Sequence, residues 1–224
     1  MLSIEEAIGI ARSGNDMDID QMRSVISCIM DGACEEDDIV DLLVALHEKG
    51  ESADEVAGAA MAMRAHANTI RCRHNDFIDV VGTGGDGAGT FNISTVSAIV
   101  TAAAGVPVAK HGNRKFTSKS GSADVLQQLG VNIEADINRV EHCLDEYGIC
   151  FCFAPLFHKA MRHVGPARKR IETPTIFNLL GPLSNPADAP FQLLGVGKPE
   201  LRPFIAETLL KLGIRRACVV HGSD

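Results

Sequence analysis

The sequence predicts an α/β protein in which a small N-terminal helical domain precedes a domain built on a mostly parallel sheet. Three observations indicate this class. Apolar residues up to about residue 70 recur at helical spacing without a convincing strand, β-branched runs alternate with helical segments from residue 77 onward, and a glycine-rich turn follows the first such run. We expect the helical domain to span residues 1–72, joined by helices from about 156–172, and the α/β domain to span 73–224.

Four helices are expected in the N-terminal domain. Ser3 with Glu6, and Ser52 with Glu55, match the capping-box pattern, in which two side chains satisfy free amides at a helix start. Apolar residues spaced by three and four then give each helix one face to bury. Glycines mark three of the expected helix ends, at Gly14, Gly32 and Gly50.

The second domain alternates strands and helices. Strands are expected at residues 77–81, 106–109, 149–153, 191–196 and 217–220, and helices at 96–104, 122–129, 138–147 and 200–212. A basic helical stretch, 156–171, interrupts this order. Such alternation favours a parallel sheet that helices cover on both faces. Cys150 and Cys152 lie two apart in an apolar run, so we expect both on one face of a buried strand.

The amino-acid composition argues against some classes of binding partner for this protein. A net charge of −8 argues against general nucleic-acid binding, which requires a basic surface. The uncharged stretch 87–109 is rich in glycine, serine and threonine, so we interpret it as loop, helix and strand rather than a membrane span. The seven cysteines lack paired metal spacing, and the N-terminus lacks a signal pattern. We therefore expect a cytoplasmic protein with reduced thiols and no membrane or nucleic-acid partner. Without tryptophan, and with Tyr147 as the one tyrosine, the core must be largely aliphatic.

A glycine-rich turn follows the strand at 77–81 and contains Gly82, Gly84, Gly85 and Gly87. Glycines let backbone N–H groups approach a ligand closely, and a helix begins just beyond, with Ser94 and Thr95 near its start. Because a helix N-terminus carries partial positive charge, strand, turn and helix together predict a phosphate site. A tight connection that binds nothing is the alternative for this turn taken alone.

The same turn fits the dinucleotide fingerprint G-x-G-x-x-G through Gly82, Gly84 and Gly87. That fingerprint requires an acidic residue roughly 20 residues further on, where it holds a ribose. The sequence places cations there instead: Lys110, Arg114, Lys115 and Lys119. The predicted ligand is therefore a heavily phosphorylated small molecule rather than NAD.

The cation-rich segment follows the strand at 106–109. A solvated charged loop is the alternative for a run of charges alone. Gly112 and Gly121, and a position at the same sheet edge as the glycine turn, favour a second anion-receiving loop. Two such loops suit a ligand with more than one phosphate group, since each charge-assisted contact contributes about 1.5–3 kcal/mol.

Five motifs occur in the order seen in anthranilate phosphoribosyltransferases, a family of tryptophan biosynthesis. They are GTGGD (82–86), NIST (92–95), KHGNR (110–114), SGSAD (120–124) and NLLGPLSNP (178–186). The chain resembles this family over its whole length. The resemblance implies a nucleoside phosphorylase/phosphoribosyltransferase-like fold, with phosphoribosyl pyrophosphate and Mg²⁺ at the glycine turn. It also implies anthranilate as the second substrate and a homodimer.

The resemblance further implies roles for individual residues, carried over motif by motif. Phosphoribosyl pyrophosphate would be bound by Gly82, Gly85, Asp86, Thr90, Asn92, Ile93, Ser94, Thr95, Lys110, His111, Gly112, Asn113, Arg114, Lys115, Phe116, Thr117, Ser118 and Ser122. Anthranilate would be held by Gly82, Asn113 and Arg168, with the guanidinium on its carboxylate. His111 and His158 would line the same channel or serve packing, and Ser94 would also be a metal ligand. No residue is assigned as a catalytic base.

Two features depart from the family pattern. Lys159 follows His158 where the family usually has proline. The family's Asp-Glu metal-binding pair lies just beyond a strand end like His221–Gly222, so it would fall beyond Asp224. We therefore expect this chain to be a fragment, incomplete at its C-terminus, and inactive or nearly so in phosphoribosyl transfer.

Two other functions stay open. Pyrimidine nucleoside phosphorylases share the architecture and a glycine-rich phosphate loop, but their motifs match residues 110–114 less well. A non-catalytic nucleic-acid-binding relative on the same scaffold would require a basic face, which the charge of −8 opposes.

Overall fold

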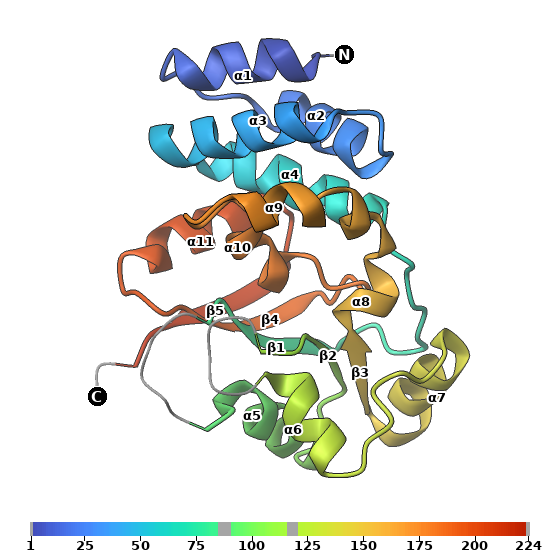
Figure 1. The fold of residues 1–224 in the computed structure, drawn as a ribbon. Coiled ribbons are helices and arrows are strands. Elements are labelled where there is room, and N and C mark those ends of the chain that lie inside the picture. Colours follow the sequence, from blue (N-terminus) through green and yellow to red (C-terminus); the bar gives the residue numbers. More distant parts are fainter. Residues whose placement is uncertain (1, 85–90, 116–120, 223–224) are drawn as a thin grey trace. The chain divides into compact units, whose positions relative to one another are not determined.

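The computed structural model describes residues 2–84, 91–115 and 121–222, and the chain divides into two compact units. The helical unit comprises Met1–Ala67, His158–Ser184 and Glu207–Leu212. The sheet unit comprises Asn68–Phe157, Asn185–Ala206 and Gly213–Asp224. The predicted fold class, a helical N-terminal part followed by a parallel-sheet α/β part, is confirmed (Figure 1).

Four helices open the helical unit: α1 (Ile4–Arg12), α2 (Ile19–Met30), α3 (Glu36–Lys49) and α4 (Ala53–Ala65). Both capping boxes expected from the sequence are formed, at the starts of α1 and α4. A third opens α2, where Asp18 accepts from Gln21 N–H at 2.8 Å and its own N–H donates to the Gln21 side chain. α2 packs against α4, and α1 against α3.

Later segments complete the helical unit with short helices. These are η1 (Lys159–His163), α9 (Gly165–Arg170), α10 (Phe177–Leu180) and η2 (Gly181–Leu183). The basic stretch expected to form a helical segment is thus divided, with Gly165 and Pro166 opening α9. Arg170 at the end of α9 forms ion pairs with Glu36 and Asp37 of α3, at 3.1 and 2.7 Å.

A buried carboxylate, Glu55, joins three helices of this unit. Its side chain is fully buried. Oε1 accepts a hydrogen bond from Met17 N–H at 3.1 Å, just before α2. Oε2 accepts from Ser52 N–H at 2.8 Å and from Lys49 Nζ, at the end of α3, at 2.9 Å. The charge is therefore paired and hydrogen-bonded, as burial of a carboxylate requires.

Five parallel strands form the sheet, in the order β3-β2-β1-β4-β5. They are β1 (Ile78–Gly82), β2 (Val108–Gly112), β3 (Ile149–Phe153), β4 (Phe191–Gly195) and β5 (Arg216–Val220). The helices that follow them in sequence are α5 (Ile93–Ala103), α6 (Ser122–Gln128), α7 (Ile137–Tyr147), α8 (Ala154–Phe157) and α11 (Leu201–Lys211). Parallel neighbours require such crossovers.

Apolar clusters cover the sheet, and a small one joins Ala123 and Leu126 of α6 to Phe153 of β3. On one side α5 packs on β1 and β2, where Ala98 contacts Val80 and Val108 in one cluster. The larger cluster includes α7 and β3, and it contains Cys150 and Cys152. Both thiols are buried, with their sulfur atoms 4.0 Å apart, which confirms that they share one strand face.

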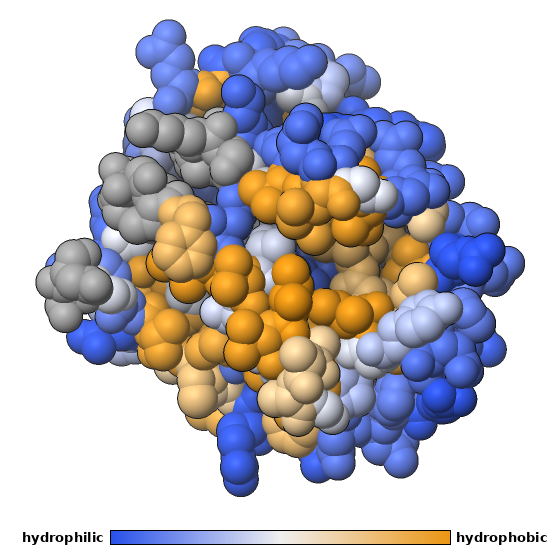
Figure 2. All heavy atoms as spheres, turned by 90° about the horizontal axis from the view of Figure 1, so that it is seen from below, coloured by the Kyte–Doolittle hydropathy of each residue, from blue (hydrophilic) through white to orange (hydrophobic). Residues whose placement is uncertain are grey.

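The outer side of α5 is apolar and exposed. Its exposed residues are Ile93, Val96, Ile99 and Val100, and Leu129 and Val131 beyond α6 are exposed as well. Figure 2, which views the molecule from this side, shows the apolar surface that results. Among the described residues, no helix is long and apolar enough to cross a membrane.

We predict that Glu55→Ala lowers the free energy of unfolding by about 2–4 kcal/mol, because the N–H groups of Met17 and Ser52 lose their buried acceptor, whereas Lys49 keeps Asp16 and the carbonyl of Gly50. Urea denaturation followed by circular dichroism measures this. Glu36→Ala is the matched control: it removes a half-exposed carboxylate paired with Arg170, and should cost at most about 1 kcal/mol. Equal losses in the two variants would contradict the role assigned to Glu55.

Candidate functional site

The carboxyl ends of β1, β2 and β4 form the edge at which the predicted site lies. The chain leaves β1 toward β2 on one side, whereas β4, on the other side of β1, leads to β5. The side of the sheet on which the chain adds its next strand therefore changes between β1 and β4, and open parallel sheets bind ligands at such a switch point. Thr83 ties the two strand ends together: its N–H donates to Gly195 O at 2.9 Å, and its Oγ1 accepts from Gly197 N–H at 3.1 Å.

Gly82 ends β1 in close contact with its surroundings. A Cβ at this position would lie 3.2 Å from Gly195 O and 3.6 Å from Ser94 Oγ. Ser94, in the first turn of α5, therefore lies directly beside the glycine turn. The predicted residues Gly85, Asp86 and Thr90 lie outside the described residues.

Polar residues lie at the start of α5. Asn92 precedes the helix as its N-cap but makes no side-chain capping hydrogen bond within the described ranges. Ile93, the first helical residue, has an exposed side chain. Thr95 is buried, and its hydroxyl has no hydrogen-bond partner in the described part of the chain. The N-terminus of this 11-residue helix carries partial positive charge, which favours an anion.

Lys110 and His111 lie within β2, because the strand continues to Gly112 instead of ending at residue 109. Both side chains are buried, at 4% and 3% exposure. Lys110 Nζ donates to Val80 O at 2.7 Å, and His111 N–H donates to Asp79 Oδ1 at 3.1 Å. Sequence reasoning missed Asp79, because it lies in an apolar run that indicates only a buried strand.

The charges of the Asp79 carboxylate and the Lys110 ammonium shift each other's pKa. Burial raises the pKa of Asp79 to about 6, against the opposing effects of the Lys110 charge and a hydrogen bond from Asn185. Burial lowers the pKa of Lys110, while the Asp79 charge raises it. The attraction between the two opposite charges therefore offsets part of the free-energy cost of burying them.

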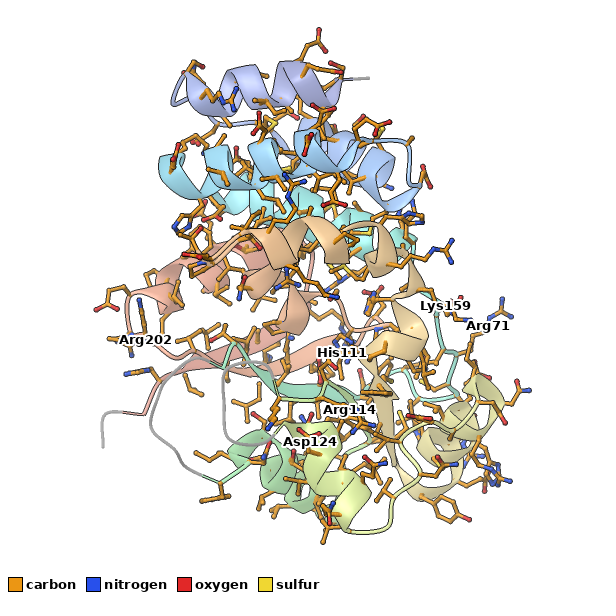
Figure 3. The ribbon with its side chains drawn as sticks, in the orientation of Figure 1. Arg71, His111, Arg114, Asp124, Lys159 and Arg202 are labelled. Carbon is orange, nitrogen blue, oxygen red and sulfur yellow. The ribbon has the colours of Figure 1, made fainter. Side chains whose placement is uncertain are left out.

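The segment after β2 is held against the start of α6 by Asp124. Oδ2 of Asp124 accepts from Lys115 N–H and from Gly121 N–H, both at 2.8 Å, and these hydrogen bonds lower its pKa. Arg114 contacts Asp124 at 3.5 Å and lies near it in Figure 3. A Cβ at Gly121 would overlap the backbone of Arg114 and Lys115, so this approach requires glycine. Asp124 is a second residue that sequence reasoning did not assign to the site.

Other predicted residues of this segment also gather at α6. Ser122 Oγ donates to the carbonyl of Asn113 at 3.3 Å, and Ala123 N–H donates to the same oxygen at 3.2 Å. The side chains of Asn113 and Lys115 are exposed. The predicted residues Phe116, Thr117 and Ser118 lie outside the described residues.

Arg168 and His158 belong to the helical unit, whereas Asn113 belongs to the sheet unit. The Arg168 guanidinium carbon lies 5.7 Å from the centroid of the Phe177 ring, and burial lowers the pKa of this group. Burial also lowers the pKa of His158 to about 4, against a hydrogen bond with the Ser184 backbone, so its ring is neutral near pH 7. Lys159 is exposed (Figure 3).

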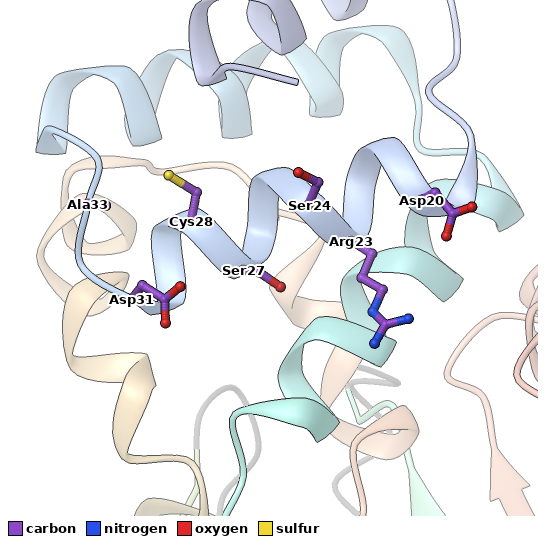
Figure 4. A pocket seen from close by; sticks show the side chains of 7 residues that line it. All are labelled: Asp20, Arg23, Ser24, Ser27, Cys28, Asp31 and Ala33. Atoms are coloured by element: carbon purple, nitrogen blue, oxygen red, sulfur yellow. The ribbon is translucent and has the colours of Figure 1, made fainter. Parts of the chain in front are cut away.

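A separate pocket of about 500 Å³ lies along α2 (Figure 4). Its lining residues are Asp20, Arg23, Ser24, Ser27, Cys28, Asp31 and Ala33. None of these is a predicted site residue. Within the described ranges, no group of three or more histidine, cysteine, aspartate or glutamate side chains is placed to hold a metal ion.

The parallel sheet and its switch point define a doubly wound α/β protein with an added helical part. Residues 74–224 match the glycosyl transferase family, a/b domain, and residues 5–67 match the glycosyl transferase family, helical bundle domain. The chain belongs to this glycosyl transferase family.

Its relatives within the family are anthranilate phosphoribosyltransferases. The protein of Rhodopirellula baltica is 51% identical over 223 residues, which are 100% of this chain and 65% of that protein. The protein of Acetivibrio thermocellus is 48% identical over 99% of this chain and 64% of its own length. The resemblance predicted from the five motifs is confirmed. The chain spans about 65% of the length of these curated relatives.

Solved structures agree with this assignment. Anthranilate phosphoribosyltransferase from Thermus thermophilus superimposes with a TM-score of 0.91 at 46% identity, over 97% of this chain and 66% of that one. The enzyme from Saccharomyces cerevisiae, in complex with PRPP and Mg, gives a TM-score of 0.88 at 29% identity, over 98% of this chain and 66% of that one.

We predict that Asp79 leaves a signature in the pH dependence of stability. Its folded-state pKa, about 6, exceeds the ordinary value of 3.8, so the folded protein holds this proton more tightly than the unfolded chain. The stabilisation is full below the unfolded pKa and is lost as the pH rises through about 6, a fall of about 3 kcal/mol. Urea unfolding across this range should show the fall in the native chain and not in Asp79→Asn.

His158 also contributes to the pH dependence of stability, and it does so in both the native chain and Asp79→Asn. Its folded-state pKa is depressed, so its contribution has the opposite sign: it is full above about 6.5 and is lost as the pH falls toward 4. Both proteins retain His158, so only the difference between their pH profiles reports on Asp79. Superimposable profiles would contradict a raised pKa at Asp79.

Proposed function

We propose that this chain carries the phosphoribosyl pyrophosphate site of an anthranilate phosphoribosyltransferase. The enzyme would transfer the phosphoribosyl group to the amine of anthranilate, giving N-(5-phosphoribosyl)anthranilate and pyrophosphate in tryptophan biosynthesis. The observation that carries the proposal is the pair of polar segments at adjacent carboxyl strand ends, after β1 and after β2, on a chain about 50% identical to proteins of that name. We also propose that the enzyme is a cytoplasmic homodimer.

The phosphate groups would be received by main-chain and hydroxyl donors. The segment from Asn92 to Thr95 offers the hydroxyl groups of Ser94 and Thr95 at the start of α5, where the helix dipole favours negative charge. The segment from Asn113 to Lys115, with Ser122, offers exposed cationic and amide groups. Gly82, Gly85, Asp86, Thr90, Lys110, His111, Gly112, Phe116, Thr117 and Ser118 are proposed to complete this site.

Ser94 is the proposed metal ligand among the described residues. Its hydroxyl lies beside Gly82, within the turn that would receive the ligand. One neutral hydroxyl fits Mg²⁺ only where phosphate oxygens and water complete the octahedron, which is how Mg²⁺ commonly binds in phosphate sites. When bound, Mg²⁺ neutralises charge on the departing pyrophosphate.

The transfer requires little covalent chemistry from the protein. The nitrogen of anthranilate attacks C1 of the ribose, the bond from C1 to the pyrophosphate oxygen breaks, and the ammonium that forms loses a proton to solvent. An aromatic amine is already a nucleophile, so no general base is assigned. The residues of the two segments would bind and orient the phosphoribosyl donor, and the helix start and cations would stabilise the developing charge.

Anthranilate would be held by Gly82, Asn113 and Arg168. The Arg168 guanidinium is half-buried against the Phe177 ring, an arrangement that fixes its direction and favours a carboxylate partner. His111 and His158 are proposed to line the channel. His158 would do so as a neutral ring, given its lowered pKa.

Ligand binding is the decisive test, because the chain spans about 65% of the length of its relatives. Isothermal titration should detect phosphoribosyl pyrophosphate binding that strengthens with Mg²⁺. Ser94→Ala should weaken it by about 10-fold, equivalent to one hydrogen bond to a charged group. Ser97→Ala, one turn further along α5, is the matched control and should bind like the native chain.

Three results would refute the proposal. They are no binding of phosphoribosyl pyrophosphate by the native chain, equal losses in Ser94→Ala and Ser97→Ala, or stabilisation by a DNA oligonucleotide alone. Binding of inorganic phosphate and a pyrimidine nucleoside in preference to phosphoribosyl pyrophosphate would favour a nucleoside phosphorylase.

We predict that Asp124→Ala weakens phosphoribosyl pyrophosphate binding by about 10-fold, because two backbone N–H groups, of Lys115 and Gly121, lose their shared acceptor. Glu134→Ala is the control, since Glu134 also carries a carboxylate near Arg114, at 3.7 Å, without touching those amides. Titration of both variants measures the effect. If the two variants bind alike, Asp124 does not organise the segment.

A further inference from the structure

Two cysteines of the helical unit meet at the end of α2. The Sγ–H of Cys34 donates to Sγ of Cys28, and the two sulfur atoms are 3.3 Å apart. Neither residue is assigned to the proposed ligand site. The sulfur atoms of a disulfide are about 2.05 Å apart, so these two need to approach each other by about 1.3 Å to form a bond.

The local sequence brings the two sulfur atoms together. Gly32, just beyond the C-cap of α2, has a φ of +74°, which favours glycine. Its N–H donates to Ile29 O at 3.0 Å. The next N–H, that of Ala33, donates to Cys28 O at 3.1 Å. These two hydrogen bonds define a Schellman turn, which places the residues after the helix against its last turn. Cys34 therefore returns to the part of α2 that carries Cys28.

The pair is accessible from solvent. Cys28 and Cys34 are both half-buried, and Cys28 lines the pocket along α2 (Figure 4). Cys150 and Cys152 form the contrast. Their sulfur atoms are 4.0 Å apart, but both residues are buried in the apolar cluster on β3. At the end of α2, proximity of two thiols and access for a small reagent coincide.

The surroundings of Cys34 determine which sulfur carries the proton. Burial and the neighbouring sulfur are the main causes that raise the pKa of the Cys34 thiol to about 12, and the charges of Asp38 and Glu5 add to them. Cys34 is therefore a thiol near pH 7, and its proton points to the sulfur of Cys28. Because a hydrogen bond of this kind stabilises a thiolate, Cys28 is the nucleophile of the pair.

We propose that Cys28 and Cys34 are a redox-active pair, which hydrogen peroxide converts into a disulfide across the turn that ends α2. The Cys28 sulfur attacks one oxygen of the peroxide, the O–O bond breaks, and the departing hydroxide takes up the Cys28 proton, which leaves a sulfenic acid and water. The Cys34 sulfur then bonds to the Cys28 sulfur, and the hydroxide that it displaces takes up the Cys34 proton. Two thiols are oxidised, one peroxide is reduced, and two waters leave.

The disulfide would close a turn on which other elements of the helical unit rest. A Cβ at Gly32 would lie 2.7 Å from the His163 ring of η1, so η1 packs directly on the turn. Oδ1 of Asp31 lies 3.1 Å from Nε2 of His66, the C-cap of α4. A covalent bond between residues 28 and 34 would restrict the backbone that makes both contacts.

Peptide mass spectrometry on the full chain tests the proposal. The chain is treated with hydrogen peroxide, and free thiols are then blocked with N-ethylmaleimide in denaturant. Trypsin should release residues 24–49 as one peptide, in which Cys28 and Cys34 are the two cysteines. We expect this peptide to lack both labels and two hydrogen atoms, and dithiothreitol to restore both thiols. Cys150 and Cys152 should keep their labels.

Two serine variants test the order of the steps. In Cys34→Ser the sulfenic acid at Cys28 has no thiol to react with, so dimedone should trap it at least about 5-fold more than in the native chain. In Cys28→Ser the thiol of Cys34 should survive the same treatment. Oxidation should slow hydrogen exchange of the Gly32 and Ala33 amides by at least about 3-fold in the native chain and leave it unchanged in Cys34→Ser.

The exposed thiol of Cys218 shows when the oxidant has acted, so the peroxide concentration is raised until Cys218 has reacted. The inference is wrong if Cys28 and Cys34 both remain labelled at that point. It is equally wrong if Cys28 is found as a sulfinic acid with Cys34 still labelled. If the serine variants fail to fold, as judged by circular dichroism, the peptide from the native chain decides. None of these results depends on phosphoribosyl pyrophosphate binding.

Discussion

The contact on which the site end of the sheet depends is a carboxylate serving as a main-chain acceptor. Asp79 takes the hydrogen bond that His111 N–H would otherwise give to the neighbouring strand. The carboxylate must be buried to do so, and its burial is tolerable because Lys110 and Asn185 lie against the same strands. Removing this contact would leave the buried His111 N–H without this acceptor.

Two other carboxylates in the chain also accept hydrogen bonds from main-chain N–H groups. Glu55 accepts from the N–H groups of Met17 and Ser52 in the helical unit, and Asp124 accepts from Lys115 and Gly121 beside α6. In each case one carboxylate gathers amides from residues that local secondary structure leaves unpaired. Part of the acidic excess, 29 acidic against 21 basic residues, thus serves to organise the backbone.

Much of the fold could be predicted from local signals. The strand at 149–153 was predicted residue for residue, and the capping boxes at Ser3 and Ser52 formed as expected. The full extent of β2 was not predicted, because an apolar pattern gives no reason to place Lys110 and His111 inside a strand. Their burial depends on Asp79 and on Asn185, which lies 76 residues beyond Ala109, and no local pattern reports such a partner. Likewise, Gly121 indicated a loop, but it did not indicate that Asp124 would accept hydrogen bonds from Lys115 N–H and Gly121 N–H.

The aliphatic core also decides which spectroscopic signals the protein can give. Tyr147 is 71% exposed at the end of α7, its ring 6.0 Å from that of His142, so its emission reports on solvent rather than on the sheet. Phenylalanines such as Phe151 and Phe153, stacked at 6.4 Å, dominate the near-ultraviolet signal of the interior. With no tryptophan in the sequence, the protein has no indole emission. A fluorescent aromatic ligand could therefore be followed without an indole background from the chain, and a single introduced tryptophan would report on its own surroundings alone.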